Sequence, residues 1–156
     1  MSMKIVSGGQ TGVDIAALEF ARENGLPYGG WVPKGRTNEA GRIPDRFSGL
    51  VETPTESVSE RTKRNVVFAD ATLIFIDGST SPGTLQTVDF AIDAGKPHLI
   101  VDLRGGTDTC AQQVRVWLAS TPIEVLNIAG PRASEAPGVG ARARAVLDQI
   151  SDRLSG

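Results

Sequence analysis

The segment at positions 7–14, Ser-Gly-Gly-Gln-Thr-Gly-Val-Asp, carries the residue types best suited to holding an anion. It follows a short apolar run at 3–6 and leads into a helical pattern over 15–21, which predicts a strand, a tight turn and a helix. Backbone N–H groups in the first turn of a helix lack helical partners and favour negative charge. Glycine lets a ligand approach the backbone, and polar side chains add hydrogen bonds. We therefore expect an oxyanion seat formed by Gly8, Gly9, Gln10, Thr11 and Gly12.

This turn lacks the commonest nucleotide-binding patterns. The Gly-x-Gly-x-x-Gly fingerprint is absent, and no Lys-Ser/Thr pair follows the last glycine as a P-loop requires. A strand-to-helix turn that uses glycine only for positive φ is the alternative. Asp14, near the first helical turn, would then cap the helix without contacting a ligand.

Two further segments place cations after predicted strands. Lys34, Gly35 and Arg36 follow the strand expected at 26–32, and the planar fork of an arginine suits a phosphate group. Arg132 follows the last predicted strand, at 124–129. Either segment is a set of ligand cations or an ordinary basic surface turn.

A second strand, polar loop and helix occupies the middle of the chain. The apolar, β-rich run 71–76 is typical of a buried parallel strand. A loop of glycine, hydroxyl and proline residues follows at 77–84, and then a helix with one apolar face. Gly83, Thr84 and Thr87 are candidates for a second set of donors to the same anion. A plain helix N-cap is the other interpretation of Thr84.

Strands alternate with helices along the chain, which predicts a single α/β domain over residues 1–156 with a Rossmann-like, doubly wound and mostly parallel sheet. Right-handed crossovers place all strand-to-helix loops at one edge, where such sheets bind ligands. The segment 37–55 shows no regular pattern, and we expect it to form a long loop that serves as a lid or an oligomer contact. Ser57 and Glu60 have capping-box spacing for the next helix.

Composition excludes several classes of protein. A net charge of −2 gives no electrostatic footprint for nucleic acid, and no apolar run is long enough for a membrane span. Cys110 is the sole cysteine and His98 the sole histidine, so we expect no metal site built by the protein. These features together predict a cytoplasmic protein.

Five segments of the chain, taken together, carry a family resemblance: 7–14, 30–36, 61–66, 83–84 and 127–132. In this order they resemble molybdenum cofactor carrier proteins, a circularly permuted, Rossmann-like branch of the SLOG superfamily. The similarity implies that the chain binds the phosphorylated pterin of molybdenum cofactor (molybdopterin), or a related nucleotide, as a carrier or storage protein. It also implies a homo-oligomer, dimer or tetramer, and a molybdoenzyme or cofactor-insertion protein as partner.

The wider group also contains the "lonely guy" phosphoribohydrolases, whose motif Pro-Gly-Gly-x-Gly-Thr-x-x-Glu ends in a catalytic glutamate. In this chain Thr87 stands where that carboxylate would be, so the resemblance implies phosphate binding without a catalytic residue. Two alternatives remain: a nucleotide-processing enzyme that uses Asp77, Glu39 or Asp14 as its carboxylate, and a nucleotide-sensing module. The full predicted ligand-binding set is Gly8, Gly9, Gln10, Thr11, Gly12, Asp14, Lys34, Gly35, Arg36, Arg61, Asn65, Asp77, Gly78, Gly83, Thr84 and Arg132.

Overall fold

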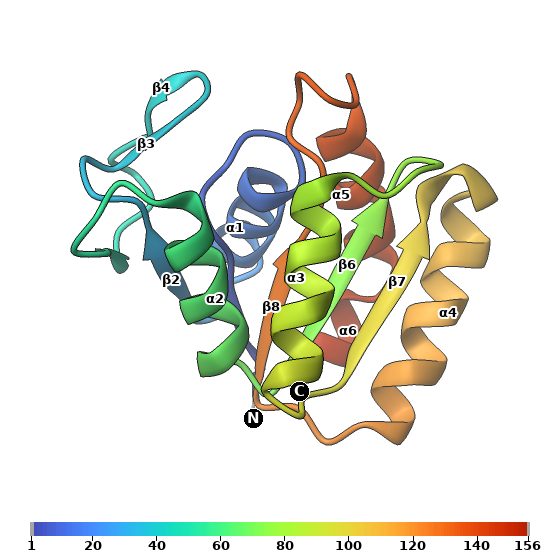
Figure 1. Cartoon of the computed structure of the whole chain (residues 1–156). Helices are drawn as coiled ribbons and strands as arrows, with labels where there is room; N and C mark the ends of the chain where they lie inside the picture. Colours follow the sequence, from blue (N-terminus) through green and yellow to red (C-terminus); the bar gives the residue numbers. More distant parts are fainter. Residues whose placement is uncertain (1, 156) are drawn as a thin grey trace.

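The structure, a computed structural model, describes residues 2–155 and is built on one six-stranded sheet (Figure 1). The strands lie in the order β5-β2-β1-β8-β6-β7, and every neighbouring pair is parallel. The strands of the sheet are β1 (Lys4–Val6), β2 (Tyr28–Val32), β5 (Leu50–Glu52), β6 (Ala71–Ile76), β7 (His98–Asp102) and β8 (Val125–Ala129).

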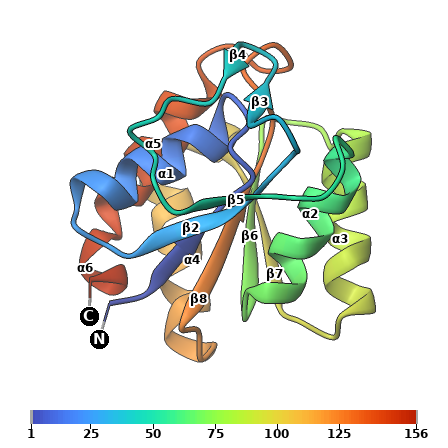
Figure 2. The same ribbon diagram turned by 90° about the vertical axis from the view of Figure 1, so that its left-hand side faces the viewer.

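Helices cover both faces of this sheet, α2 and α3 on one face and α1, α4 and α5 on the other (Figures 1 and 2). The crossovers through α1 and α4 move across the sheet in one direction, whereas those through α2 and α3 move in the other. Right-handed connections must then place the two pairs on opposite faces. The predicted doubly wound α/β fold is confirmed. The helices are α1 (Val13–Glu23), α2 (Val58–Phe68), α3 (Pro82–Asp93), α4 (Thr107–Ser120), α5 (Val139–Gln149) and α6 (Ser151–Leu154), with a 3-10 turn at Leu103–Gly105.

The two faces of the sheet bury different kinds of side chain. On the α1/α4/α5 face an apolar core includes Phe20, Val114 and Leu147, all fully buried. The α2/α3 face instead buries the polar side chains of Arg61, Asn65, Thr84 and Thr87. Because buried polar groups cost free energy unless they are paired, they mark this face as the place to look for a site.

Residues 37–55 contain three short strands, so the prediction of a long loop without regular structure was wrong. The expected role of this segment as a lid or an oligomer contact stays a prediction. A short hairpin of β3 (Thr37–Asn38) and β4 (Gly41–Arg42) comes first, and β5 then pairs with β2 as the outer strand of the sheet. Ile43 and Phe47 are fully buried against Leu18 and Val32, which anchors the end of the hairpin. We call residues 37–47 the hairpin segment.

The strand order reverses between β8 and β6. These neighbours pair directly, yet the helices that follow them, α5 and α3, lie on opposite faces of the sheet. Doubly wound folds bind ligands in the crevice that such a reversal opens at the carboxyl ends of the strands. The cap assignments differ between the two helices of this face: Ser57 caps α2 as expected, but α3 is capped by Ser81 rather than Thr84.

Candidate functional site

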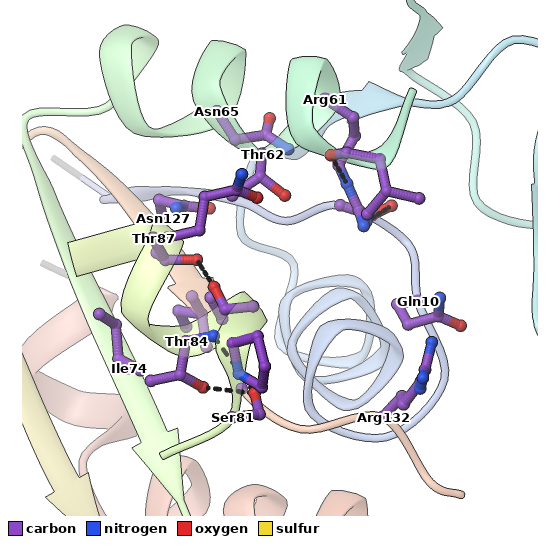
Figure 3. Close-up of a pocket in the computed structure, with 18 of the residues that line it drawn as sticks. Gln10, Arg61, Thr62, Asn65, Ile74, Ser81, Thr84, Thr87, Asn127 and Arg132 are labelled. Atoms are coloured by element: carbon purple, nitrogen blue, oxygen red, sulfur yellow. Dashed lines mark hydrogen bonds between the residues drawn. The ribbon is translucent and has the colours of Figure 1, made fainter. Parts of the chain in front are cut away.

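A cavity of about 280 Å³ opens at the carboxyl ends of β8 and β6, between the first turns of α2 and α3 (Figure 3). Four segments meet there: the turn after β1, the start of α2, the start of α3 and the chain that follows β8. The polar and glycine residues that line it are Gly8, Gln10, Arg61, Thr62, Asn65, Ser81, Gly83, Thr84, Gln86, Thr87, Asn127, Gly130, Arg132 and Glu135.

The first turn of α3 forms one wall of this cavity. The Thr84 N–H donates to Ser81 Oγ at 3.2 Å, and Thr87 Oγ1 donates to the Gly83 carbonyl at 2.9 Å. A Cβ added at Gly83 would meet Ser81 Oγ at 3.8 Å as its nearest neighbour. The backbone at Gly83 is therefore open to the cavity at the positive end of a twelve-residue helix, an arrangement that favours an anion.

Arg61 reaches from α2 under the turn after β1. Its Nη1 donates to the Gly8 carbonyl at 2.6 Å and lies 3.4 Å from Asp14 Oδ2. Both side chains are buried, and burial raises the pKa of the Asp14 carboxyl from 3.8 to about 6 even though Arg61 acts in the opposite direction. The charge of Arg61 is thus partly balanced within the protein before any ligand is considered.

The glycines of the turn after β1 make room for the protein itself. A Cβ at Gly8 would lie 2.1 Å from Arg61 Nη1, and one at Gly9 would lie 2.8 Å from Ile43 Cδ1. At Gly12, where φ is +80°, a Cβ would lie 2.4 Å from the Pro131 carbonyl oxygen. The sequence pattern predicts that these glycines admit a ligand to the backbone, whereas the space beside each of them is taken by protein atoms. Of the predicted seat, Gly8 and Gln10 line the cavity, whereas Gly9, Thr11 and Gly12 lie outside its lining.

The basic turn after β2 lies away from the cavity and has a structural role. Arg36 has φ of 54°, and its guanidinium donates to the carbonyls of Ile43, Pro44 and Phe47. The Gly35 N–H donates to the Glu52 carboxylate at 2.7 Å, and Lys34 is exposed. These three residues are absent from the cavity lining, because the side chain of Arg36 folds back onto the hairpin segment.

Asp77 and Gly78 also lie outside the lining. Two hydrogen bonds from Arg142, at 2.7 and 3.0 Å, hold the Asp77 carboxylate against α5 and lower its pKa. Gly78 is bound on both sides, by Asp102 Oδ1 and by the Arg104 guanidinium. This loop turns towards β7 and α5, so neither residue reaches the cavity.

Asn65 lines the cavity, but its amide has partners within the protein. Its Oδ1 accepts from the Trp31 N–H at 2.8 Å, and its Nδ2 donates to the Trp31 carbonyl at 3.1 Å. Asn65 therefore fixes α2 to β2 by a pair of hydrogen bonds. Its predicted part in ligand binding stays a prediction, since Asn65 also lines the cavity.

Sequence reasoning missed several residues of the lining. Asn127 interrupts the apolar strand β8 and is 3% exposed, a polar residue whose position in a strand was a usable signal. The pair Ser81-Pro82 is a typical helix start, and it places the first residue of the helix at Pro82, before Gly83 and Thr84. Glu135 supplies the one carboxylate among the lining residues of the described chain. Nothing in its local sequence distinguishes it from other loop glutamates.

Comparison with known proteins places the chain in a family. Residues 5–151 match the model of the circularly permutated YpsA SLOG family. The chain belongs to this family. It is also similar, at 44% identity and a TM-score of 0.91, to a protein of known crystal structure from Syntrophus aciditrophicus described as a "putative molybdenum carrier protein"; the match covers 94% of this chain and 93% of that one. A comparison with curated proteins finds no match.

Two further findings concern residues 2–155 of this circularly permuted SLOG protein. In that part of the chain, no three side chains of His, Cys, Asp or Glu gather where they could hold a metal ion. No helix there has both the length and the apolar character needed to cross a bilayer. The family model and the solved relative, rather than these two absences, support the resemblance to molybdenum cofactor carriers of the SLOG superfamily.

Proposed function

We propose that this protein binds a phosphorylated small molecule in the cavity, with the phosphate at the N-terminus of α3, and that molybdenum cofactor is the cargo it carries. The observation that carries the proposal is the open backbone at Gly83, at a helix N-terminus on the edge where the strand order reverses. The described relative supports the choice of cargo.

The cavity wall suits a neutral, hydrogen-bonding ring beside the phosphate. Thr62, Gln86 and Asn127 contribute hydroxyl and amide groups, whereas Arg61 is already paired with Asp14. A pterin or a nucleobase presents both donors and acceptors, which amides can match from either side.

In the first turn of α3 Pro82 has no N–H, and the N–H groups of Thr84 and Leu85 already donate to Ser81. The phosphate is then held mainly by the Gly83 N–H and the dipole of α3.

The experiment that tests this proposal is mass spectrometry and fluorescence of small molecules released from freshly purified protein, with molybdenum measured in the same sample. A phosphorylated pterin with stoichiometric molybdenum supports the carrier. A nucleotide in its place would contradict the cargo but keep the phosphate site, and empty protein that binds neither inorganic phosphate nor a phosphorylated ligand would contradict both.

A nucleotide-processing enzyme is a second candidate because Glu135 places a carboxylate in the lining. The carboxylates first considered for that role lie elsewhere: Asp14 is buried behind Arg61, Asp77 faces Arg142, and Glu39 belongs to the hairpin segment. Release of a free base from a nucleoside monophosphate by the wild-type protein, and its loss in Glu135→Gln, would favour the enzyme.

A further inference from the structure

The hairpin segment contacts the turn after β1 and the chain after β8 through one carboxylate, that of Glu39. Glu39 Oε1 accepts from Ser134 Oγ at 2.5 Å, and Oε2 accepts from the Ser134 N–H at 3.1 Å. The Thr11 hydroxyl also donates to Oε2, and Arg132 Nε lies 3.6 Å from Oε1. Three hydrogen-bond donors and one guanidinium, from two distant segments of chain, therefore converge on this carboxylate. Arg132 Nε lies at the same distance, 3.6 Å, from Glu135 Oε1.

These donors are arranged independently of the hairpin that supplies the carboxylate. The Ala133 N–H donates to Thr11 Oγ1 at 3.1 Å, which joins the two segments to each other and directs the Thr11 hydroxyl hydrogen elsewhere. Gly12 packs against the Pro131 carbonyl, so the two turns lie in direct contact. A hydroxyl pair, a backbone N–H and a guanidinium at one point are the groups that proteins use for phosphate and carboxylate.

The donor cluster adjoins the cavity, because Arg132 lines the cavity and Thr11 follows Gln10 of its wall (Figure 3). We propose that Thr11, Arg132 and Ser134 form a second oxyanion seat. The Glu39 carboxylate occupies this seat in the free protein, and an anionic group of the ligand displaces it on binding. The proposal rests on the proposed function in that the seat serves the same ligand. Ligand binding would then release the tip of the hairpin segment from the turn after β1 and from the chain after β8.

The attachment of the hairpin tip agrees with such an exchange. Besides the contacts of the Glu39 carboxylate, two hydrogen bonds hold the tip. The Asn38 side-chain amide donates to the Gly9 carbonyl at 2.9 Å, and the Glu39 backbone N–H donates to Gln10 Oε1 at 3.0 Å. The buried anchor lies further along, at Ile43 and Phe47. The tip can therefore leave the seat while its base stays packed in the core.

The test is anion rescue of Glu39→Ala, with Glu39→Gln as the matched control because its amide keeps the seat filled. The melting temperature of each is measured in acetate and in inorganic phosphate against chloride at equal ionic strength. An anion at about tenfold its Kd should raise Tm of Glu39→Ala by roughly 3–6 °C more than that of the wild type or Glu39→Gln. An equal response in all three proteins would overturn the proposal.

A second measurement uses the unaltered protein. Hydrogen exchange of amides 37–42 is followed as inorganic phosphate is added, and entry of phosphate into the seat should speed exchange there because Glu39 is displaced. Slower or unchanged exchange contradicts the proposal. Failure of the proposed α3 site would give a different result. Phosphate would then leave the Tm of Glu39→Gln unchanged, while it would still raise the Tm of Glu39→Ala.

Discussion

Gly83 differs from most glycines near the site in what surrounds its missing Cβ. At Gly8, Gly12 and Gly130 an added Cβ would lie within 2.6 Å of another protein atom, so those glycines are required by the fold. At Gly83 the nearest atom is 3.8 Å away and the backbone does not have positive φ. A substitution at Gly83 therefore tests the ligand site with little disturbance of folding.

We expect Gly83→Ala to weaken binding of the phosphorylated ligand by about tenfold, equivalent to ~1.4 kcal/mol. The new methyl tilts towards the N-terminus of α3, where the phosphate is proposed to lie. Stability should hold or rise, since alanine is the better helix former by ~0.5–1 kcal/mol. Calorimetric titration and thermal unfolding measure the two effects.

Gly105→Ala is the control for this substitution. Gly105 also has open space around its missing Cβ and lacks positive φ, and it lies outside the cavity lining. Gly105→Ala should leave the affinity for the phosphorylated ligand unchanged. Equal affinity in the wild type and both variants would show that the phosphate does not approach the first turn of α3.

At the scale of the elements, Arg36 holds the hairpin segment together. Its guanidinium binds three carbonyls of residues 43–47, and its own carbonyl accepts from the Ile43 N–H at 2.9 Å. Arg36→Ala should leave those carbonyls without this partner and destabilise the segment locally by ~1.5–3 kcal/mol, the range for a hydrogen bond to a charged group. Hydrogen exchange should speed up over residues 37–47, while binding of phosphate at α3 is retained.

Arg42→Ala provides the comparison within the same hairpin. The side chain of Arg42 is 62% exposed and pairs with the exposed Asp45, so its removal should change exchange little. If Arg36→Ala abolished phosphate binding while the hairpin segment kept its protection, Arg36 would be a ligand cation after all, as its place in the sequence first suggested.

The sequence predicts elements and the sheet edge better than it predicts individual side-chain roles. The strand at 71–76 and the Ser57 cap follow from local patterns, and both are confirmed. The short strand β5 was missed because three residues of a half-exposed edge carry almost no periodicity. The roles of Arg36 and Asp77 depend on partners 7 to 65 positions away. Basic and acidic loop residues look alike in sequence whether they face a ligand or another loop.

At the scale of the whole molecule, the sheet separates an apolar layer under α1, α4 and α5 from a more polar layer under α2 and α3. The ion pair of Arg61 and Asp14 ties that polar layer together, because it joins α2 to the start of α1. Burial opposes the charge on both partners: it lowers the pKa of Arg61 and raises that of Asp14 to about 6. The site is thus supported by a pair whose ionised form is costly to bury.

This cost predicts a particular pH dependence of global stability. Since the pKa of Asp14 is higher in the folded protein than the ordinary 3.8, the folded state binds that proton more tightly. The resulting stabilisation is complete below about pH 4 and is lost as the pH rises through about 6, by up to ~3 kcal/mol. Relative to Asp14→Asn, the wild type should therefore lose stability between about pH 4 and 7 in urea unfolding.

Asp77→Asn should give the opposite trend and so checks the sign. Hydrogen bonds from Arg142 lower the pKa of Asp77, so its contribution is present at neutral pH and is lost as the pH falls through the folded pKa. The wild type should gain stability relative to Asp77→Asn as the pH rises. If the Asp14 difference instead rose with pH, attraction to Arg61 would outweigh burial, and the polar layer would be stabilised by its charges rather than in spite of them.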